Sequence, residues 1–174
     1  MEALYFLVES VLSLAVYAFL MRVLLQLVRA DFRNPLAQAV ISLTNWLVLP
    51  LRRVLPPAGR FDTASFVALL AVQLVATLIL FRIRTGAVYP FVPLAAEAFR
   101  RLANATLLLY TVLIFAQAIL SFVPGARSPL TSMLDSLCAP VLRPIRRILP
   151  VVGGLDFSPL VAILGLTALR ILLR

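Results

Sequence analysis

Four long apolar stretches constrain the fold of this sequence more than any other feature. They cover residues 4–28, 65–81, 102–123 and 157–173. A helix that crosses the hydrocarbon core of a bilayer needs about 20 predominantly apolar residues. Hydrophobic residues make up 63% of the chain, whereas about 45–50% is usual in soluble domains. The sequence therefore predicts an all-α membrane protein with four transmembrane helices.

The second half of the chain repeats the first. Residues 34–75 align with residues 128–169 without a gap, at a constant offset of 94 (128 − 34). Each copy contains two predicted spans, so both copies enter the membrane in the same direction, as parallel repeats. We expect repeat 1 over residues 1–84, a linker over 85–101 and repeat 2 over 102–174. The matched residues that chance explains poorly are Pro50 and Pro144, Arg52 and Arg146, Arg53 and Arg147, Pro56 and Pro150, Gly59 and Gly153, and Asp62 and Asp156.

A shorter apolar run lies between the two spans of each repeat. In the first copy it follows Asn34-Pro35, a sequence typical of a helix start. It extends for about 14 residues, which is too short to cross a bilayer. Polar Gln38, Ser42 and Asn45 fall on one face of the predicted helix. The pattern fits an interfacial or re-entrant helix and equally a helix packed against the bundle.

A motif with two prolines follows each of these loop helices. The two copies read Pro50-Leu-Arg-Arg-Val-Leu-Pro56 and Pro144-Ile-Arg-Arg-Ile-Leu-Pro150. Proline disfavours helical geometry in the residue before it, so the motifs predict that each loop helix ends there and that a loop follows. Gly59 and Gly153 are expected to permit a turn with positive φ.

The charged residues of this motif have a structural and a functional interpretation. Arg52-Arg53 and Arg146-Arg147 can anchor the chain to anionic lipid headgroups and set its topology. Asp62 and Asp156 can cap the span that follows. Alternatively, a pseudo-twofold axis would bring the two arginine pairs and the two aspartates near one centre. They would then form salt bridges across the copies or a cationic vestibule.

Polar residues inside the predicted spans are further site candidates. Arg22 and Gln26 lie one turn apart on the first span. Gln117 and Ser121 have the same spacing on the third span, and with a one-residue gap they are the counterparts of that pair. Ionisable residues inside a membrane are costly and mark functional sites. Because Gln117 keeps the polarity without the charge, we expect the two copies to differ in role.

Charge and composition exclude several classes of function. The formal net charge is +9, and every basic residue is an arginine. The arginines lie beside apolar spans, which favours contact with anionic lipid headgroups over nucleic acid. The chain has no histidine and one cysteine, Cys138. Catalytic and metal-binding groups are therefore hard to assemble, and we expect no enzyme activity, no metal and no cofactor.

The Arg22 and Gln26 pair ahead of Asn34-Pro35, and the proline–arginine–glycine–aspartate run that ends at Asp62, resemble the YggT family of small bacterial membrane proteins. The run recurs in the second half, so the resemblance covers nearly the whole chain. Gln117 departs from the pattern, because an arginine is expected there. The resemblance implies association with osmotic or potassium-ion tolerance in some bacteria and with cell division in others. In plastids it implies cofactor assembly of membrane cytochromes.

Two functions are compatible with these features. The first is a conduit, or the regulator of one, in ion or osmotic homeostasis; four spans are few for a monomeric pore, so a homo-oligomer would be needed. The alternative is a scaffold or assembly factor that binds other membrane proteins. The resemblance places the protein in the bacterial cytoplasmic (inner) membrane. The repeat loops hold nine arginines and the opposite side six, which favours an outside N-terminus and cytoplasmic loops.

Overall fold

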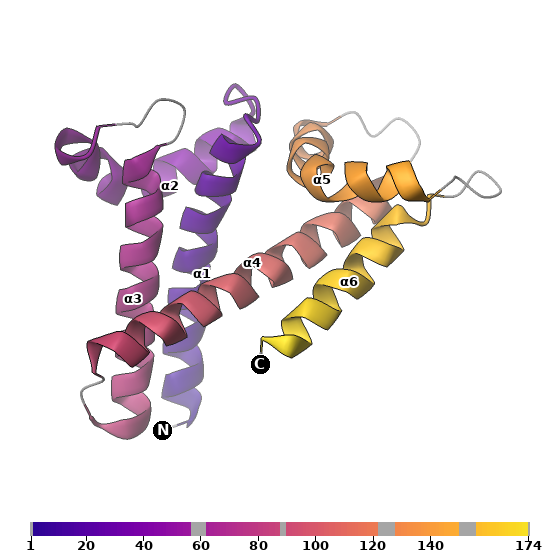
Figure 1. Cartoon of the computed structure of the whole chain (residues 1–174). Coiled ribbons are helices and arrows are strands. Elements are labelled where there is room, and N and C mark those ends of the chain that lie inside the picture. The colour runs from indigo at the N-terminus through magenta and orange to yellow at the C-terminus, as the bar shows by residue number, and fades with distance from the viewer. Residues whose placement is uncertain (1, 57–61, 88–89, 122–127, 150–155, 174) are drawn as a thin grey trace. The chain divides into compact units, whose positions relative to one another are not determined.

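The computed structural model describes residues 2–56, 62–87, 90–121, 128–149 and 156–173 of the 174-residue chain (Figure 1). Six helices occupy these ranges, and the described residues contain no strand. The prediction of an all-α protein is confirmed. The helices are α1 (Glu2–Leu27), α2 (Pro35–Val54), α3 (Thr63–Thr85), α4 (Phe91–Ser121), α5 (Pro129–Ile148) and α6 (Ser158–Leu172).

Three of the described helices are long and apolar enough to cross a membrane. They are α1, α3 and α4, with 26, 23 and 31 residues. Helix α6 is apolar but has only 15 residues, which corresponds to about 22 Å of helix against a hydrocarbon core of about 30 Å. The structure therefore supports a membrane protein with three candidate spans, and the fourth span stays a prediction.

Local sequence signals explain where the helices begin and end. The carboxylate of Asp62 accepts a hydrogen bond from the Ser65 backbone N–H and so caps α3, as predicted. Gly86 ends the same helix with φ of 69°, a left-handed conformation that glycine adopts without strain. Ser128 and Thr131 form a capping box at the start of α5. Each of these contacts satisfies a backbone group that would otherwise be left unpaired at a helix end.

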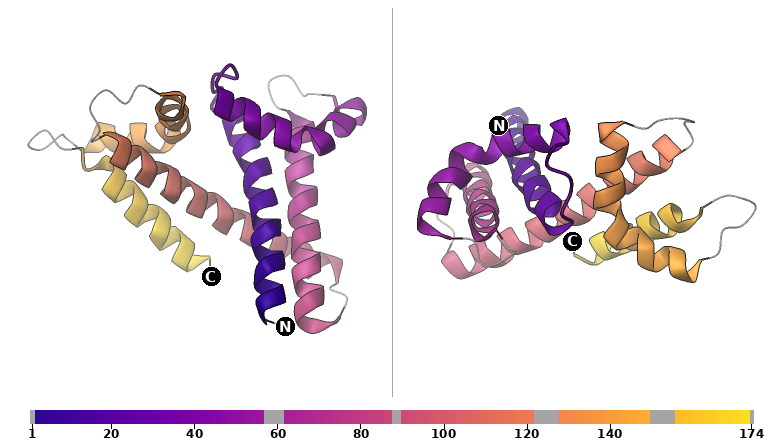
Figure 2. Two further views of the ribbon diagram at one scale, coloured as in Figure 1. Left: turned by 180° about the vertical axis from the view of Figure 1, so that it is seen from behind. Right: turned by 90° about the horizontal axis from the view of Figure 1, so that it is seen from above.

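The prediction that Pro50 and Pro144 end the loop helices is wrong. Helix α2 continues through Pro50, and α5 continues through Pro140 and Pro144. Residues 50–54 and 144–148 therefore form the last turns of α2 and α5. Proline inside a helix removes one hydrogen bond and bends the axis without always ending it. Figure 2 shows that both helices change direction along their length.

The expected linker also differs from the prediction in its local structure. Residues 85–101 carry Gly86, Pro90 and Pro93, which favour a connection between two helices. Helix α4 nevertheless begins at Phe91, so most of this segment is helical. Proline is compatible with the first turn of a helix, because the backbone N–H that it lacks has no partner there.

The described chain forms two compact units. The first comprises residues 1–26 and 39–103, and the second comprises residues 27–38 and 104–174. In the first unit α1 and α3 lie side by side, and α2 lies across the ends at which α1 stops and α3 starts (Figure 1, Figure 2). Its interior is built of apolar side chains, including Phe19, Leu20, Leu69 and Ala68.

The second unit contains the end of α4 together with α5 and α6. The side-chain amide of Asn104 on α4 donates to the Leu173 carbonyl at the end of α6 (3.3 Å). Helix α5 buries its apolar face, and this face forms most of the interior of the unit. The fully buried residues of that face are Leu134, Leu137, Cys138 and Leu142.

Candidate functional site

Arg22 is the centre of the polar site in the first unit. It lies five residues before the end of α1, and its side chain is 2% exposed. Its Nε donates to the Ser65 hydroxyl of α3 (3.0 Å). Its Nη1 donates to the Ile41 carbonyl (3.1 Å), the Thr44 hydroxyl (2.7 Å) and the Asn45 side-chain oxygen (2.9 Å), all on α2. One guanidinium therefore joins α1, α2 and α3.

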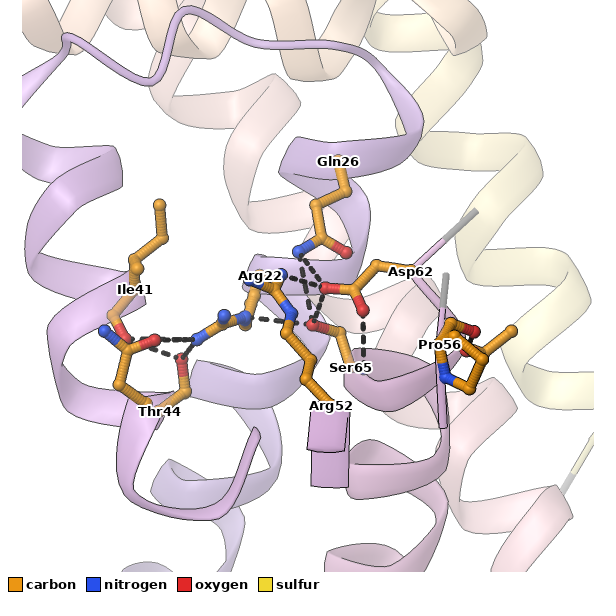
Figure 3. Close-up of polar contacts among 10 residues, drawn as sticks. Arg22, Gln26, Ile41, Thr44, Arg52, Pro56, Asp62 and Ser65 are labelled. Carbon is orange, nitrogen blue, oxygen red and sulfur yellow. Dashed lines mark hydrogen bonds and ion pairs between the residues drawn. The ribbon is translucent and has the colours of Figure 1, made fainter. Parts of the chain in front are cut away.

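The hydrogen bonds of the site extend from Arg22 through Ser65 to the ion pair between Arg52 and Asp62. Asp62 Oδ2 accepts hydrogen bonds from the Ser65 hydroxyl (2.7 Å) and from Gln26 Nε2 (3.0 Å), and Arg52 Nη2 also donates to it. Gln26 Nε2 lies 3.2 Å from the Ser65 hydroxyl as well. Ser65 thus connects the buried arginine to the carboxylate (Figure 3). We call Arg22, Gln26, Thr44, Asn45, Arg52, Asp62 and Ser65 the Arg22 cluster.

The charges of the Arg22 cluster are unequal. It contains two guanidinium groups and one carboxylate. Of the two guanidinium groups, only that of Arg52 forms a salt bridge with the Asp62 carboxylate. Burial alone would raise the pKa of Asp62, but hydrogen bonds from Arg52 and Ser65 outweigh burial and lower it to about 2. Asp62 is therefore ionised at neutral pH. Arg22 keeps a buried charge that is compensated mainly by neutral oxygen atoms, an arrangement that is costly inside a membrane.

The corresponding part of the second unit is built differently. Gln117 on α4 donates through Nε2 to Asp135 Oδ1 on α5 (2.6 Å). Its Oε1 atom is buried, and no described group lies within hydrogen-bond distance of it. Ser121, which was paired with Gln117 in the sequence, donates only to the Ala118 carbonyl of its own helix (2.7 Å). The two positions therefore differ in their contacts, and the predicted difference in role stays a prediction.

Each unit contains one ion pair between the end of its loop helix and the start of the next helix. Arg52 pairs with Asp62, and Arg146 Nε lies 2.8 Å from Asp156 Oδ2. Contacts with Ser158 and Arg146 outweigh burial and lower the pKa of Asp156. Both pairs join residues 10 positions apart within one half of the chain. Salt bridges across the copies stay a prediction.

The remaining motif residues are placed as follows. Arg53 and Arg147 are exposed in the last turns of α2 and α5. The Pro56 carbonyl accepts from the Thr63 hydroxyl at the start of α3 (2.9 Å). Pro50 and Pro144 lie within α2 and α5. Three predicted site residues, Gly59, Pro150 and Gly153, lie outside the described residues.

A second charged cluster lies in the first unit. Glu97 accepts from Arg100 (2.8 Å) and from Arg101 (2.9 Å), all near the start of α4. Arg101 also lies 4.0 Å from Glu9 of α1. The Arg101–Glu9 contact joins the start of α4 to α1.

The remaining candidate groups are the metal-ligating side chains and the single cysteine. Among the described residues, no three side chains of the histidine, cysteine, aspartate and glutamate types form a group that could hold a metal ion. Cys138 is fully buried, and burial raises the pKa of its thiol to about 12. The thiol is therefore protonated and inert at neutral pH.

Comparison with known proteins identifies the family. The family model described as CCB3/YggT matches residues 1–83 and 96–174. The chain belongs to the CCB3/YggT family. It is 37% identical over 166 residues to the uncharacterized protein YggT of Escherichia coli strain K12, covering 94% of this chain and 85% of that protein. No solved structure matches the chain.

Two further relatives show the range of the CCB3/YggT family. An uncharacterized protein of Vibrio alginolyticus, named for its position in the proC 3' region, is 36% identical over 168 residues, which is 95% of this chain and 90% of that protein. YlmG homolog protein 2, a chloroplastic protein of Arabidopsis thaliana, is 36% identical over 60 residues, which is 34% of this chain and 24% of that protein. None of these names assigns a biochemical activity.

Sequence reasoning for this CCB3/YggT chain missed several partners of the site. Thr44 and Ser65 were not singled out, although both contact Arg22. The spacing Asp62-x-x-Ser65 is a usable signal, since the third helical residue commonly contacts the N-cap. Thr44 offers no comparable signal. Whether Thr44 lies near Arg22 depends on how α2 crosses α1, and local sequence does not encode that crossing.

Proposed function

We propose that this protein supports ion and osmotic homeostasis in the bacterial cytoplasmic (inner) membrane, as a conduit or as the regulator of one. The observation that carries the proposal is the Arg22 cluster, a buried cationic site at the end of two candidate spans. Ionisable groups at such positions are expensive, and in transport proteins they mark ion pathways or switches. Family membership by itself assigns no activity.

The geometry of the Arg22 cluster favours a regulator over an open pore. Arg22 makes four hydrogen bonds to Ser65, Ile41, Thr44 and Asn45. These contacts hold α2 across the ends of α1 and α3, where an aqueous pathway between those spans would have to open. Movement of α2 would break them. The cluster is thus suited to hold a closed arrangement that a change in its surroundings releases.

The Arg52–Asp62 ion pair supplies a physical route for such a change. The side chain of Arg52 is 43% exposed, whereas that of Asp62 is 13% exposed. Salt screens interactions between exposed charges and affects buried ones much less. A rise in ionic strength would therefore weaken the hold of Arg52 on Asp62 before it disturbs Arg22. This gives the regulator a response to osmotic stress.

The proposal is tested by potassium flux into proteoliposomes that contain the purified protein. We expect flux, or its salt dependence, to change in Arg22→Gln and in the fourfold variant Arg52→Gln/Arg53→Gln/Arg146→Gln/Arg147→Gln. Arg84→Gln is the matched control, because Arg84 is an exposed arginine at the end of α3. Flux absent at every salt concentration from folded, inserted protein would contradict a conduit. A regulator would then be sought by reconstitution with its channel.

A second function, as a membrane scaffold or assembly factor, is favoured by a different observation. Helix α6 is too short to match the core thickness, yet it exposes Leu164, Leu169, Ile171 and Leu172. An apolar helix of this kind can pair with a helix of another membrane protein or of a second copy. Photo-crosslinking from position 164 in membranes would capture that partner. Crosslinks to lipid alone would contradict the scaffold function.

The membrane arrangement belongs to the same proposal. We place the loop helices on the cytoplasmic side of the membrane and the N-terminus outside, with α6 as a short fourth span that completes two parallel repeats. A cysteine at position 90, in a Cys138→Ser background, reports the orientation through labelling with a membrane-impermeant thiol reagent. Labelling from outside is expected, and protection there would reverse the topology. Enzyme activity forms no part of this proposal.

A further inference from the structure

The two edges of α2 in the first unit differ sharply in exposure. One edge is buried against the unit and includes Thr44 and Val48. The other edge consists of apolar side chains with no cover from the described residues: Leu43 is 67% exposed, Trp46 is 69% exposed and Val54 is 77% exposed. Large apolar side chains grouped on one side of a surface helix mark an interaction surface.

Arg22 sets the depth of this edge in the membrane. Helix α1 has 26 residues, about 39 Å, so with α1 centred on a core of about 30 Å each end extends slightly beyond the hydrocarbon. Arg22, five residues before the end of α1, then lies within about one helical turn of the hydrocarbon boundary. Its hydrogen bonds to Thr44 and Asn45 hold α2 at that level.

We propose that the edge formed by Leu43, Trp46, Leu49 and Val54 is inserted into the lipid surface at the headgroup boundary, with Arg53 bound to an anionic lipid phosphate. Tryptophan favours this depth because its ring is apolar and its N–H is polar. The ring of Trp46 also packs edge-on against buried Phe19, with ring centroids 6.2 Å apart. This contact fixes α2 to α1 and turns the rest of the indole outward.

Charge complementarity supports lipid as the occupant. Arg53 is exposed in the last turn of α2, one residue from Val54. An arginine near a membrane surface is attracted to anionic lipid headgroups. Helix α5 differs in its middle part: Leu137, the counterpart of Leu43, is buried, and a proline, Pro140, stands where α2 has Trp46. Its large exposed apolar side chains, Leu130 and Ile148, lie near its two ends. The continuous insertion surface is therefore proposed for α2, and it does not depend on the proposed function.

Trp46 is the only tryptophan in the chain, so its fluorescence reports on this edge without labelling. The protein is reconstituted into phosphatidylcholine vesicles with and without phosphatidylglycerol. We expect lipids brominated near the headgroup to quench Trp46 about twofold more strongly than lipids brominated near the chain ends, consistent with an interfacial depth. Aqueous iodide should quench it weakly. Strong iodide quenching, or protection from both quenchers, would overturn the proposal; the second result would indicate a protein partner.

Two variants test separately the insertion of the α2 edge into lipid and the contact of Arg53 with a lipid phosphate. In Trp46→Phe/Arg143→Trp the tryptophan moves to the exposed edge of α5, where we expect iodide to quench it more strongly than bromolipid. We expect phosphatidylglycerol to increase the protection of Trp46 from iodide, because Arg53 binds the lipid phosphate. This additional protection should be lost in Arg53→Gln, whereas Arg84→Gln should retain it. Both arginines are exposed, so neither change threatens folding. Equal behaviour of Arg53→Gln and Arg84→Gln would contradict the phosphate contact.

Discussion

The Arg22 cluster and the Gln117–Asp135 contact occupy related places in the two halves of the chain, but they are held together differently. In the first unit one guanidinium makes four hydrogen bonds to two neighbouring helices. In the second unit one amide makes a single hydrogen bond to the described residues, and Gln117 Oε1 is buried with no hydrogen-bond partner among them. Guanidinium offers five N–H donors and a side-chain amide offers two, so arginine alone can join three helices.

The hydrogen-bond partners of Arg22 and Gln117 also differ in charge. Asp135 stands 94 positions after Ile41 and brings a carboxylate where the first unit uses a backbone carbonyl. In the first unit the buried positive charge of Arg22 is therefore hydrogen-bonded by neutral oxygen atoms. In the second unit the exposed negative charge of Asp135 accepts a hydrogen bond from the Gln117 amide. We infer that the first unit is the more rigid of the two. Four predictions test this comparison.

The largest effect is expected from Arg22→Gln, which gives the first unit the side chain found in the second. The change removes four hydrogen bonds, worth about 0.6 kcal/mol each inside membranes, and should cost about 2 kcal/mol of unfolding free energy. Gln117→Ala removes one hydrogen bond and should cost less than about 1 kcal/mol. Unfolding of both variants in detergent measures the difference. Equal losses would show that the two sites are energetically alike.

The aspartates give the next comparison. Asp62 accepts from Arg52, Gln26 and Ser65, and it is mostly buried. Asp62→Asn should therefore cost about 1–2 kcal/mol, since hydrogen bonds to charged groups are the stronger ones. Asp156 is more exposed, and Asp156→Asn should cost about 0.2–1 kcal/mol, as for other exposed ion pairs. A larger loss from Asp156→Asn would reverse the proposed order of rigidity.

The same residues show what the sequence could predict. The start of α2 at Pro35 and the capping of α3 by Asp62 follow from local rules, and the structure has both. Local rules failed at Pro50, where α2 continues. Contacts on both sides of Pro50 explain the failure: Thr44 and Asn45 bind Arg22 before it, and Arg52 binds Asp62 after it.

The partners of Arg22 were beyond the reach of the sequence for a different reason. A buried arginine requires acceptors, and Gln26 at one turn's distance was the obvious candidate. The structure instead uses Thr44 and Ser65, which are 22 and 43 positions away. Such pairings depend on the crossing of α2 over α1 and α3. The position of the site was therefore predictable, whereas its composition required the fold.

The pH dependence of the first unit follows from the lowered pKa of Asp62. That pKa is about 2 in the folded protein and about 3.9 in an unfolded chain. The ionised carboxylate therefore stabilises the fold above about pH 4, and this contribution is lost as the pH falls through about 2. Carboxyl carbon NMR shifts would follow the titration of Asp62. In Arg52→Gln its midpoint should rise toward the usual value, and an unchanged midpoint would contradict the role of Arg52.

The smallest effect is expected from giving the second unit an arginine. In Gln117→Arg the new guanidinium can pair with Asp135, which already lies 2.6 Å from the Gln117 amide nitrogen. Because Asp135 is exposed, the gain in unfolding free energy should be about 0.5 kcal/mol. Gln117→Arg/Asp135→Ile restores the isoleucine of the first unit and removes the carboxylate, so the gain should vanish. If the double variant is as stable as the single one, neutral oxygens in the second unit solvate arginine as those around Arg22 do. The two halves would then differ only in the residue at this position, and not in the site that surrounds it.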